Sequence, residues 1–401
     1  MESKRSRKSS SPRAKERELV YVDENRQLRR LIEHCRRQPA LAVDTEANPM
    51  FAYRERLCLL QISSRSRDYI VDPLADVDIG LLAEIFADVG IVKVLHGAEF
   101  DVLQLKRAWP FEIRGLFDTR VAAASLGFDA PSLAAVLREW LDVEVDKAHQ
   151  RSDWGKRPLS AGQLEYARDD TRYLIELSNL LRAELHEAGP PHMDEVAAEC
   201  RRVEAMCPEP RDDDKNDWIR IKGATALDPI GHRVLRDLNR LRHRIAEERD
   251  RPLFKVFGND VLLKLAKAKP VNLDQLRRSN ALTPRLLGRY GRDLVDVIAA
   301  AKEKGPLKRL PSTRRHREEQ LRGEQRELYE AIRAFRKNVA ERRQTDASLV
   351  MSKQLMMELA KCRPLPTTFD KLADSKLLEP WRLAEYGDEL ARAIARASGE
   401  S

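Results

Sequence analysis

Two acidic residues follow a short apolar run near the start of the chain. In the segment LAVDTEANPM, Asp44 and Glu46 come directly after the apolar residues 41–43. Side chains two residues apart on a strand point to the same side, so these carboxylates would lie side by side and repel each other. A strand that runs out into solvent is one explanation of the pattern, and a cation held between the two carboxylates is the other.

A third acid stands where a predicted strand passes into a helix. The apolar run IVKVL is followed by HGAEFDVLQL, which places Asp101 in the first turn of the expected helix. Loops after strand ends are where α/β sheets hold their ligands. Asp101 and its neighbour Glu99 also suit the positive N-terminal end of a helix, so a purely structural role stays open.

A phenol and a fourth acid share one face of a late helix. The segment from SAGQLEYARDD to ELHEAG predicts one long helix over 160–189, begun by a capping box of Ser160 and Gln163. Tyr166 and Asp170 are four residues apart and therefore lie on the same face. Either this end of the helix surfaces in water, or the two polar groups need partners, because an unpaired polar group is costly to bury.

The four carboxylates of Asp44, Glu46, Asp101 and Asp170 come from three separate elements, and they can meet at one point only around divalent cations. Oxygen ligands without a neighbouring His or Cys cluster favour Mg²⁺ or Mn²⁺ over Zn²⁺. Two such ions, about 3.5 to 4 Å apart, can clamp the attacking and leaving oxygens of an in-line phosphoryl displacement. The sequence therefore predicts a site for two divalent ions, Mg²⁺ or Mn²⁺.

Alternating strand and helix signals over 18–210 must position these side chains. The segments LAVDTE, LCLLQIS, DYIVDP and IVKVLHG predict strands, and the polar turn SRSR joins the second to the third. AEFDVLQLKRAW predicts a helix, as do TRVAAASLG, which Gly127 ends, and SLAAVLREWL, which Ser132 caps. This order is typical of an α/β domain.

Beyond the polar segment EPRDDDKND the chain is helical and repeats itself. A shift of 94 positions aligns KLAKAKP with ELAKCRP, and a shift of 96 aligns LTPRLLGRYGRDL with LEPWRLAEYGDEL. Each repeat starts with an amphipathic helix whose apolar face must pack on its own later helices. We expect two small all-α domains, over 211–302 and 321–401, joined by a basic linker over 303–320.

Composition and charge bound the class of protein. The chain has 73 Lys and Arg against 65 Asp and Glu, a net charge of +8 that suggests a polyanionic partner. Residues 1–17, rich in Lys, Arg and Ser, predict a disordered basic tail. Five scattered cysteines without a C-x-x-C pair disfavour disulfides and zinc, and no apolar run is long enough for a membrane span. We expect a cytoplasmic protein, and the sequence predicts no protein partner.

Three of these motifs, in this order, resemble the exonuclease motifs of the tyrosine branch of the DEDD superfamily. They are DTE at 44–46, HGAEFD ending at Asp101, and YARDD from Tyr166 to Asp170. The segments LFDTRVAA and DKAHQRSDWGKRPLS resemble the ribonuclease D family within that branch. The helical repeats resemble its C-terminal HRDC domains, here present twice, so the resemblance covers about residues 20–400.

The resemblance implies a ribonuclease-H-like α/β exonuclease domain over 18–210, followed by two HRDC-like domains. It implies a metal-dependent 3′-to-5′ exoribonuclease that releases nucleoside 5′-monophosphates from a single-stranded RNA 3′ end. Asp44, Glu46, Asp101 and Asp170 would hold two metal ions. Tyr166 would orient the attacking water, because a phenol with a pKa near 10 is a poor base at neutral pH. Family analogy alone suggests transfer RNA precursors or other structured RNA as the substrate.

Further residues in the matching segments are candidates for substrate contacts. Lys147 would neutralise a phosphate of the substrate, or it is an ordinary surface lysine. His96 and Phe100 would line a pocket for the terminal base or ribose, or they pack at the end of a strand. Asp118 is a further candidate in these matching segments, or it caps the N-terminus of a helix.

Two other functions fit the same residues. One is the same chemistry on DNA, as a proofreading or repair exonuclease, although no polymerase-like or helicase-like segment accompanies the motifs. The other is a non-catalytic nucleic-acid-binding module, against which the complete set of four acids and a tyrosine argues. Arginines of the first repeat, such as Arg285, Arg289 and Arg292, either bind RNA or keep the surface soluble.

Overall fold

A six-stranded sheet in the order β1-β4-β3-β2-β5-β6 carries the predicted motifs. In this computed structural model, which describes residues 17–129, 131–208, 216–310, 321 and 323–399, the strands are β1 (Glu18–Val22), β2 (Ala40–Ala47), β3 (Leu57–Ser63), β4 (Arg67–Val71), β5 (Val92–Leu95) and β6 (Leu116–Asp118). Strands β3 and β4 are antiparallel, whereas the pairs β1–β4, β2–β5 and β5–β6 are parallel. Strand β2, which carries Asp44 and Glu46, is therefore an interior strand.

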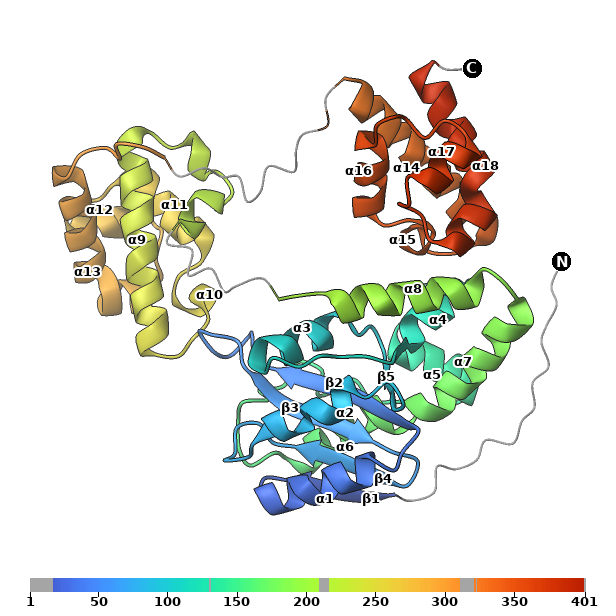
Figure 1. The fold of residues 1–401 in the computed structure, drawn as a ribbon. Helices are drawn as coiled ribbons and strands as arrows, with labels where there is room; N and C mark the ends of the chain where they lie inside the picture. The colour runs from blue at the N-terminus through green and yellow to red at the C-terminus, as the bar shows by residue number, and fades with distance from the viewer. Residues whose placement is uncertain (1–16, 130, 209–215, 311–320, 322, 400–401) are drawn as a thin grey trace. The chain divides into compact units, whose positions relative to one another are not determined.

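Helices cover this sheet and bury its apolar side chains (Figure 1). They are α1 (Asn25–Cys35), the 3-10 turn η1 (Ile79–Leu82), α2 (Ala83–Ala87), α3 (Glu99–Ala108), α4 (Thr119–Ser125), α5 (Leu133–Leu141), α6 (Ala161–Arg172), α7 (Leu174–Ala188) and α8 (His192–Ala205). The main core contains Leu41 and Val43 of β2. A smaller core, with Trp154 and Ala167, lies where α6 contacts β3 and β4.

Most of the expected strands and helices of this region are present. The caps also agree, since Ser132 accepts a hydrogen bond from the backbone of Ala135, and Ser160 and Gln163 form the capping box of α6. The prediction of one long helix over 160–189 is wrong, because the helix breaks at Tyr173. The part before the break packs in the smaller core and the part after it packs in the main core, so one straight helix would not serve both. The sequence patterns did not predict β1, β6, α1, η1, α2 or α8.

Both helical repeats fold as expected small helical bodies, each with its own apolar core. The first contains the 3-10 turns η2 (Asp217–Arg220) and η3 (Ala224–Ala226) and helices α9 (Pro229–Glu248), α10 (Leu253–Val256), α11 (Asn259–Ala268), α12 (Leu273–Arg278) and α13 (Pro284–Glu303). The second contains α14 (Glu324–Arg343), α15 (Ala347–Val350), α16 (Lys353–Lys361), α17 (Phe369–Asp374) and α18 (Pro380–Ser398).

The two repeats share individual contacts at the shift of 94 positions found in the sequence. Arg242 donates to the carbonyl of Phe257 at 3.2 Å, and Arg336 donates to the carbonyl of Met351 at 3.1 Å. After the first long helix, Asp250 and its counterpart Gln344 both have a positive φ, of 42° and 53°. The sequence repeat therefore reflects a repeated structure.

The chain clusters into two compact units that do not follow the linear order of the expected domains. One unit combines residues within 1–46, 57–208 and 320–401, and the other combines the segment 47–56 with residues within 209–319. The predicted tail, except Arg17, and residues 311–320 of the predicted linker lie outside the described residues. The boundaries at 18, 210, 302 and 321 stay a prediction. Within the described ranges, no helix has the length and apolar character to cross a bilayer.

Candidate active site

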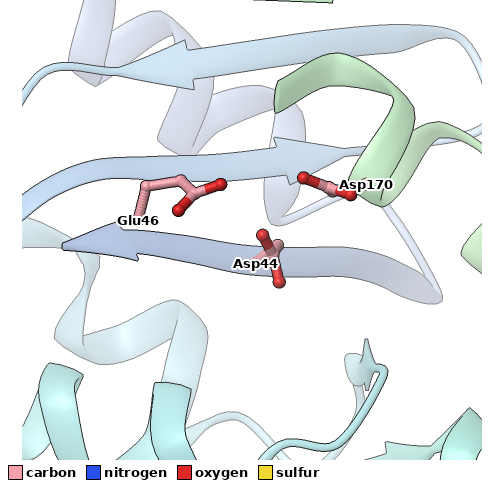
Figure 2. A group of neighbouring side chains, drawn as sticks. All are labelled: Asp44, Glu46 and Asp170. Atoms are coloured by element: carbon pink, nitrogen blue, oxygen red, sulfur yellow. The ribbon is translucent and has the colours of Figure 1, made fainter. Parts of the chain in front are cut away.

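Three carboxylates from two elements meet above the sheet. Asp44 and Glu46 lie two residues apart on β2, and Asp170 lies near the end of α6. One carboxylate oxygen from each lies within 4.8 Å of the other two. Figure 2 shows the side chains of Asp44 and Glu46 on one strand with Asp170 descending toward them from the helix. Both acids lie within β2, which extends to Ala47, and their side chains are only partly exposed.

Asp101 reaches the same region from the first turn of α3. It is buried, and its Oδ1 accepts a hydrogen bond from the hydroxyl of Thr45 at 2.5 Å. Thr45 stands between Asp44 and Glu46 in the sequence, so this bond ties the start of α3 to the strand that carries the other acids. The charge of Asp101 raises the pKa of both Asp44 and Glu46.

The pKa values of all four carboxyls are raised, first by burial. The pKa of Glu46 rises to about 9, because the charges of Asp170 and Asp101 add to the effect of burial. The pKa values of Asp101 and Asp170 rise to about 7. Asp44, which faces the other three acids, has a pKa well above its ordinary value. The protein alone therefore disfavours the charged state of this cluster.

Among the residues that the structure describes, no basic side chain neutralises the cluster. Within the described ranges, no lysine, arginine or histidine forms an ion pair with any of the four acids, whereas the adjacent Asp169 pairs with Arg172 at 3.1 Å. Buried carboxylates are stable when they are paired or when they coordinate a metal. Several oxygen ligands in one partly open group fit hard divalent cations such as Mg²⁺ or Mn²⁺.

Tyr166 lies one helical turn before Asp170 and is held by aromatic neighbours. Its ring centroid is 5.9 Å from that of Trp154 and 6.3 Å from that of His149, which meets it edge-on. Burial and then the charge of Asp170 raise the pKa of Tyr166 well above its ordinary value. The phenol therefore stays protonated at neutral pH, and it can donate a hydrogen bond.

Asp118 organises the loop that leads into α3, a role that sequence reasoning only partly anticipated. It caps the N-terminus of α4 by accepting from the backbone N–H groups of Arg120 and Val121. Its two oxygens also accept from Gly97 N at 2.9 Å and Ala98 N at 2.7 Å. Asp118 therefore holds the loop that places Asp101, and the N-cap reading is confirmed.

Two ion pairs missed at the sequence level hold α6 and its preceding loop on the sheet. Arg168, which the sequence presented as a possible solvated neighbour, is largely buried and pairs with Asp68 at 2.9 Å. Arg157 donates to both oxygens of Asp72 at 2.6 and 2.7 Å and to the carbonyl of Trp154 at 2.7 Å. These arginines have no local pattern that would reveal partners about a hundred residues away.

The three residues expected to contact substrate differ in their surroundings. Phe100 is 51% exposed beside Asp101, so its ring is available to a ligand. Lys147 is exposed in the loop before α6. His96 is half-buried, and its two ring nitrogens already lie 3.0 Å from the hydroxyl of Thr119 and the carbonyl of Pro131. Both nitrogens of His96 are thus engaged within the protein.

Comparison with known proteins places this site in a family. The family described as 3′-5′ exonuclease matches residues 19–186, and the HRDC domain family matches residues 232–298 and 325–394. Ribonuclease D of Pseudomonas paraeruginosa is 31% identical over 386 residues, which cover 95% of this chain and 98% of that protein.

Solved structures agree with this placement. The catalytic core of RRP6 from Trypanosoma brucei matches with a TM-score of 0.62 and 26% identity, over 72% of this chain and 80% of that one. RNase D of Escherichia coli shares the fold over 94% of this chain and 99% of its own, with a TM-score of 0.61 and 24% identity.

The sheet, the acidic cluster and the helical repeats together define a 3′-to-5′ exonuclease domain followed by two HRDC domains, which confirms the predicted architecture. Exonucleases of this kind depend on divalent metal ions. The chain belongs to the ribonuclease D family, a family of 3′-to-5′ exoribonucleases.

Proposed function

We propose that this chain removes nucleotides one at a time from the 3′ end of transfer RNA precursors or other structured RNA, by hydrolysis at the cluster of Asp44, Glu46, Asp101 and Asp170. The observation that carries the proposal is the meeting of ligand oxygens from Asp44, Glu46 and Asp170 within 4.8 Å. The family relationship supports RNA as the polymer. The products are nucleoside 5′-monophosphates.

In this proposal the four carboxylates hold two divalent ions, Mg²⁺ or Mn²⁺. When bound, such ions supply stabilisation of the charge that develops on the attacking and leaving oxygens. Two of these ligands, Asp44 and Glu46, lie two residues apart on the interior strand β2. The strand therefore fixes their positions relative to each other. Asp101 is oriented by its bond from Thr45, which lies on the same strand as Asp44 and Glu46.

Tyr166 positions the attacking water in this proposal. Its raised pKa keeps the hydroxyl protonated, so the phenol donates a hydrogen bond and does not accept the proton of the water. Trp154 and His149 fix the plane of the ring. A fixed donor orients the water toward the scissile phosphate without an entropic loss at the moment of reaction.

Substrate contacts follow from the exposure of the candidate residues. Phe100 offers a ring face on which the terminal base can stack, and such stacking contributes about 1 to 3 kcal/mol per base. Lys147 offers a positive charge to a substrate phosphate. His96 would line the pocket without bonding to the substrate through its ring nitrogens, because these bind Thr119 and the backbone of Pro131.

The predicted domains over 18–210, 211–302 and 321–401 would then be the catalytic domain and two HRDC domains that hold RNA. The cytoplasmic location also stays a prediction.

Incubation of the purified full-length chain with matched 3′-tailed RNA and DNA, with and without Mn²⁺ or Mg²⁺, tests the proposal. We expect mononucleotide release from RNA only, and only with the divalent ion. Asp44→Asn should lower the rate by several orders of magnitude with little change in RNA affinity, because it removes a metal ligand and leaves the basic surfaces intact.

The matched control is Asp169→Asn, which removes a neighbouring carboxylate that pairs with Arg172 instead of joining the cluster. This variant should cleave at close to the wild-type rate. Release from DNA alone would support the rival DNA exonuclease, and RNA binding without release in any metal would support the non-catalytic module. Wild-type cleavage by Asp44→Asn would remove the basis of the site assignment.

A further inference from the structure

The second HRDC domain binds a carboxylate with an arginine and a tyrosine. Arg343, at the end of α14, pairs with both oxygens of Glu195 on α8, and the hydroxyl of Tyr386 on α18 lies 3.4 Å from the same carboxylate. Ser125 donates a further hydrogen bond to Glu195 at 2.8 Å. The guanidinium of Arg343 lies 6.0 Å from the centroid of the Tyr386 ring. Arginine and tyrosine together thus form an anion-binding pair.

The first HRDC domain has the same pair at the equivalent positions. The shift of 94 positions aligns Arg249 with Arg343, and the shift of 96 aligns Tyr290 with Tyr386. The guanidinium of Arg249 lies 5.3 Å from the centroid of the Tyr290 ring.

The backbone confirms that Arg249 and Arg343 are equivalent. Just after Arg249, the N–H of Arg251 donates to the carbonyl of Ala246 at 2.9 Å, as that of Thr345 does to Ala340 at 3.0 Å in the second repeat. The chain therefore leaves the long helix in the same way in both repeats, and the two arginines occupy the same place.

The equivalent pair of the first repeat binds no acid among the described residues. Arg249 is exposed, and within the described ranges no carboxylate forms an ion pair with it. A second arginine, Arg289, lies 6.0 Å from the same Tyr290 ring. The site therefore presents at least two positive charges around one buried aromatic ring, where the second repeat holds a carboxylate.

The surroundings of the two pairs differ in charge. Exposed arginines on α13 stand where the second repeat has an aromatic or acidic residue; Arg285, Arg289 and Arg292 correspond to Trp381, Glu385 and Asp388. The three arginines are spaced by four and then three residues, which places them on one face of α13 over about two turns. A row of positive charges without ion pairs in the described part of the chain suits a series of phosphates better than it suits a single carboxylate.

We propose that Arg249 and Tyr290, with the arginine face of α13, form a binding site for backbone phosphates of the RNA substrate, while the second HRDC domain uses the equivalent surface to bind Glu195 of its own chain. The proposal rests on the proposed function, because it takes RNA as the substrate. It answers the question that the sequence left open, whether these arginines bind RNA or only keep the surface soluble. The contacts go to phosphates, so they do not select a base sequence.

The test measures RNA binding by the full-length chain without divalent ion. A 5′-fluorescein-labelled single-stranded RNA is titrated with wild type, Arg249→Gln and Arg289→Gln over a series of KCl concentrations. Each substitution should weaken binding by about fivefold and reduce the slope of log Kd against log salt by about 1. Thermal unfolding should be unchanged in Arg249→Gln, because this side chain is exposed.

The matched control is Arg277→Gln on α12, which removes the same charge from an exposed arginine that pairs with Asp274. Wild-type affinity and salt slope in Arg249→Gln and Arg289→Gln would overturn the proposal, as would an equal loss in Arg277→Gln. Failure here is distinguishable from failure of the proposed function, since metal-dependent release of mononucleotides from short RNA is measured separately. If RNA binds through Arg249 but is never cleaved, the phosphate-binding site is supported and the exonuclease assignment is wrong.

Discussion

Asp44, Glu46, Asp101 and Asp170 are held in one region by the fold although burial, and then the charges of nearby acids, disfavour their ionisation. A group with a raised pKa in the folded state binds more protons there than in the unfolded chain, so the free energy of unfolding falls as pH rises through that window. Stability is thus lost at this site in the absence of a cation. The loss is of the kind often found at functional sites.

For the metal-free protein we expect the free energy of unfolding to decrease between about pH 4, where the unfolded carboxyls titrate, and about pH 9, where Glu46 titrates in the folded protein. Affinity for Mn²⁺ should rise over the same window, because the metal competes with protons for the carboxylates. Urea unfolding and calorimetric titration at a series of pH values measure both. Asp44→Asn should weaken the dependence of the free energy of unfolding on pH. An affinity for Mn²⁺ that is independent of pH would contradict this account.

Among the elements, α6 depends on ion pairs that link it and its loop to the sheet. The carboxylate of Asp72 is 6% exposed and accepts bonds from Arg157 and from the hydroxyl of Tyr21. Because the same Arg157 binds the carbonyl of Trp154, it positions the indole that packs against Tyr166. The loop before α6 thus contributes to the site without supplying a ligand.

Arg157→Gln should destabilise the protein by about 3 kcal/mol, because it leaves the buried Asp72 without its cation. The rate of cleavage should fall more than RNA affinity does, since Trp154 no longer holds Tyr166. Arg36→Gln is the control, because Arg36 and Glu84 form an exposed pair whose loss should cost at most about 1 kcal/mol. Urea unfolding followed by tryptophan fluorescence compares the free energies of unfolding of the two variants. Equal midpoints for the two variants would show that Arg157 has no special structural role.

In the whole molecule, the second HRDC domain is joined to α8 of the catalytic domain by a buried ion pair. Glu195 is fully covered and Arg343 is 12% exposed, and Thr345 adds a hydrogen bond to the carbonyl of Ala124 at 3.0 Å. Gly127 approaches the carbonyl of Gln344 so closely that a side chain there would lie 3.1 Å from it. These contacts join the second HRDC domain to α4 and α8 within one compact unit.

A double-mutant cycle on Glu195 and Arg343 measures this contact. Arg343→Met alone should cost about 3 kcal/mol, because it leaves Glu195 covered and without its cation. Combining it with Glu195→Gln should recover part of that loss, since the uncompensated charge is gone. Urea unfolding gives the four free energies. Strictly additive effects would mean that the two side chains do not interact in solution.

Local sequence determined the kinds of elements and the candidate residues. Side-chain period, caps and turn residues identified most of the central strands, the helices that carry Asp101 and Tyr166, and both helical repeats, because these signals depend on residues a few positions apart. The acids could be named for the same reason, as carboxylates next to strand ends and on a helix face are visible in short motifs.

Only the tertiary structure decided which of these groups meet. The bond from Thr45 to Asp101, the break of the predicted long helix at Tyr173, the ion pair of Arg157 with Asp72 and the contact of Arg343 with Glu195 each join parts of the chain with separate local patterns. Such contacts depend on how the whole core packs, and many sequences with the same periodicity could pair differently. The pair of Arg249 and Tyr290 in the first repeat has a structural equivalent, Arg343 with Tyr386, that binds the carboxylate of Glu195, and only the tertiary structure shows this contact.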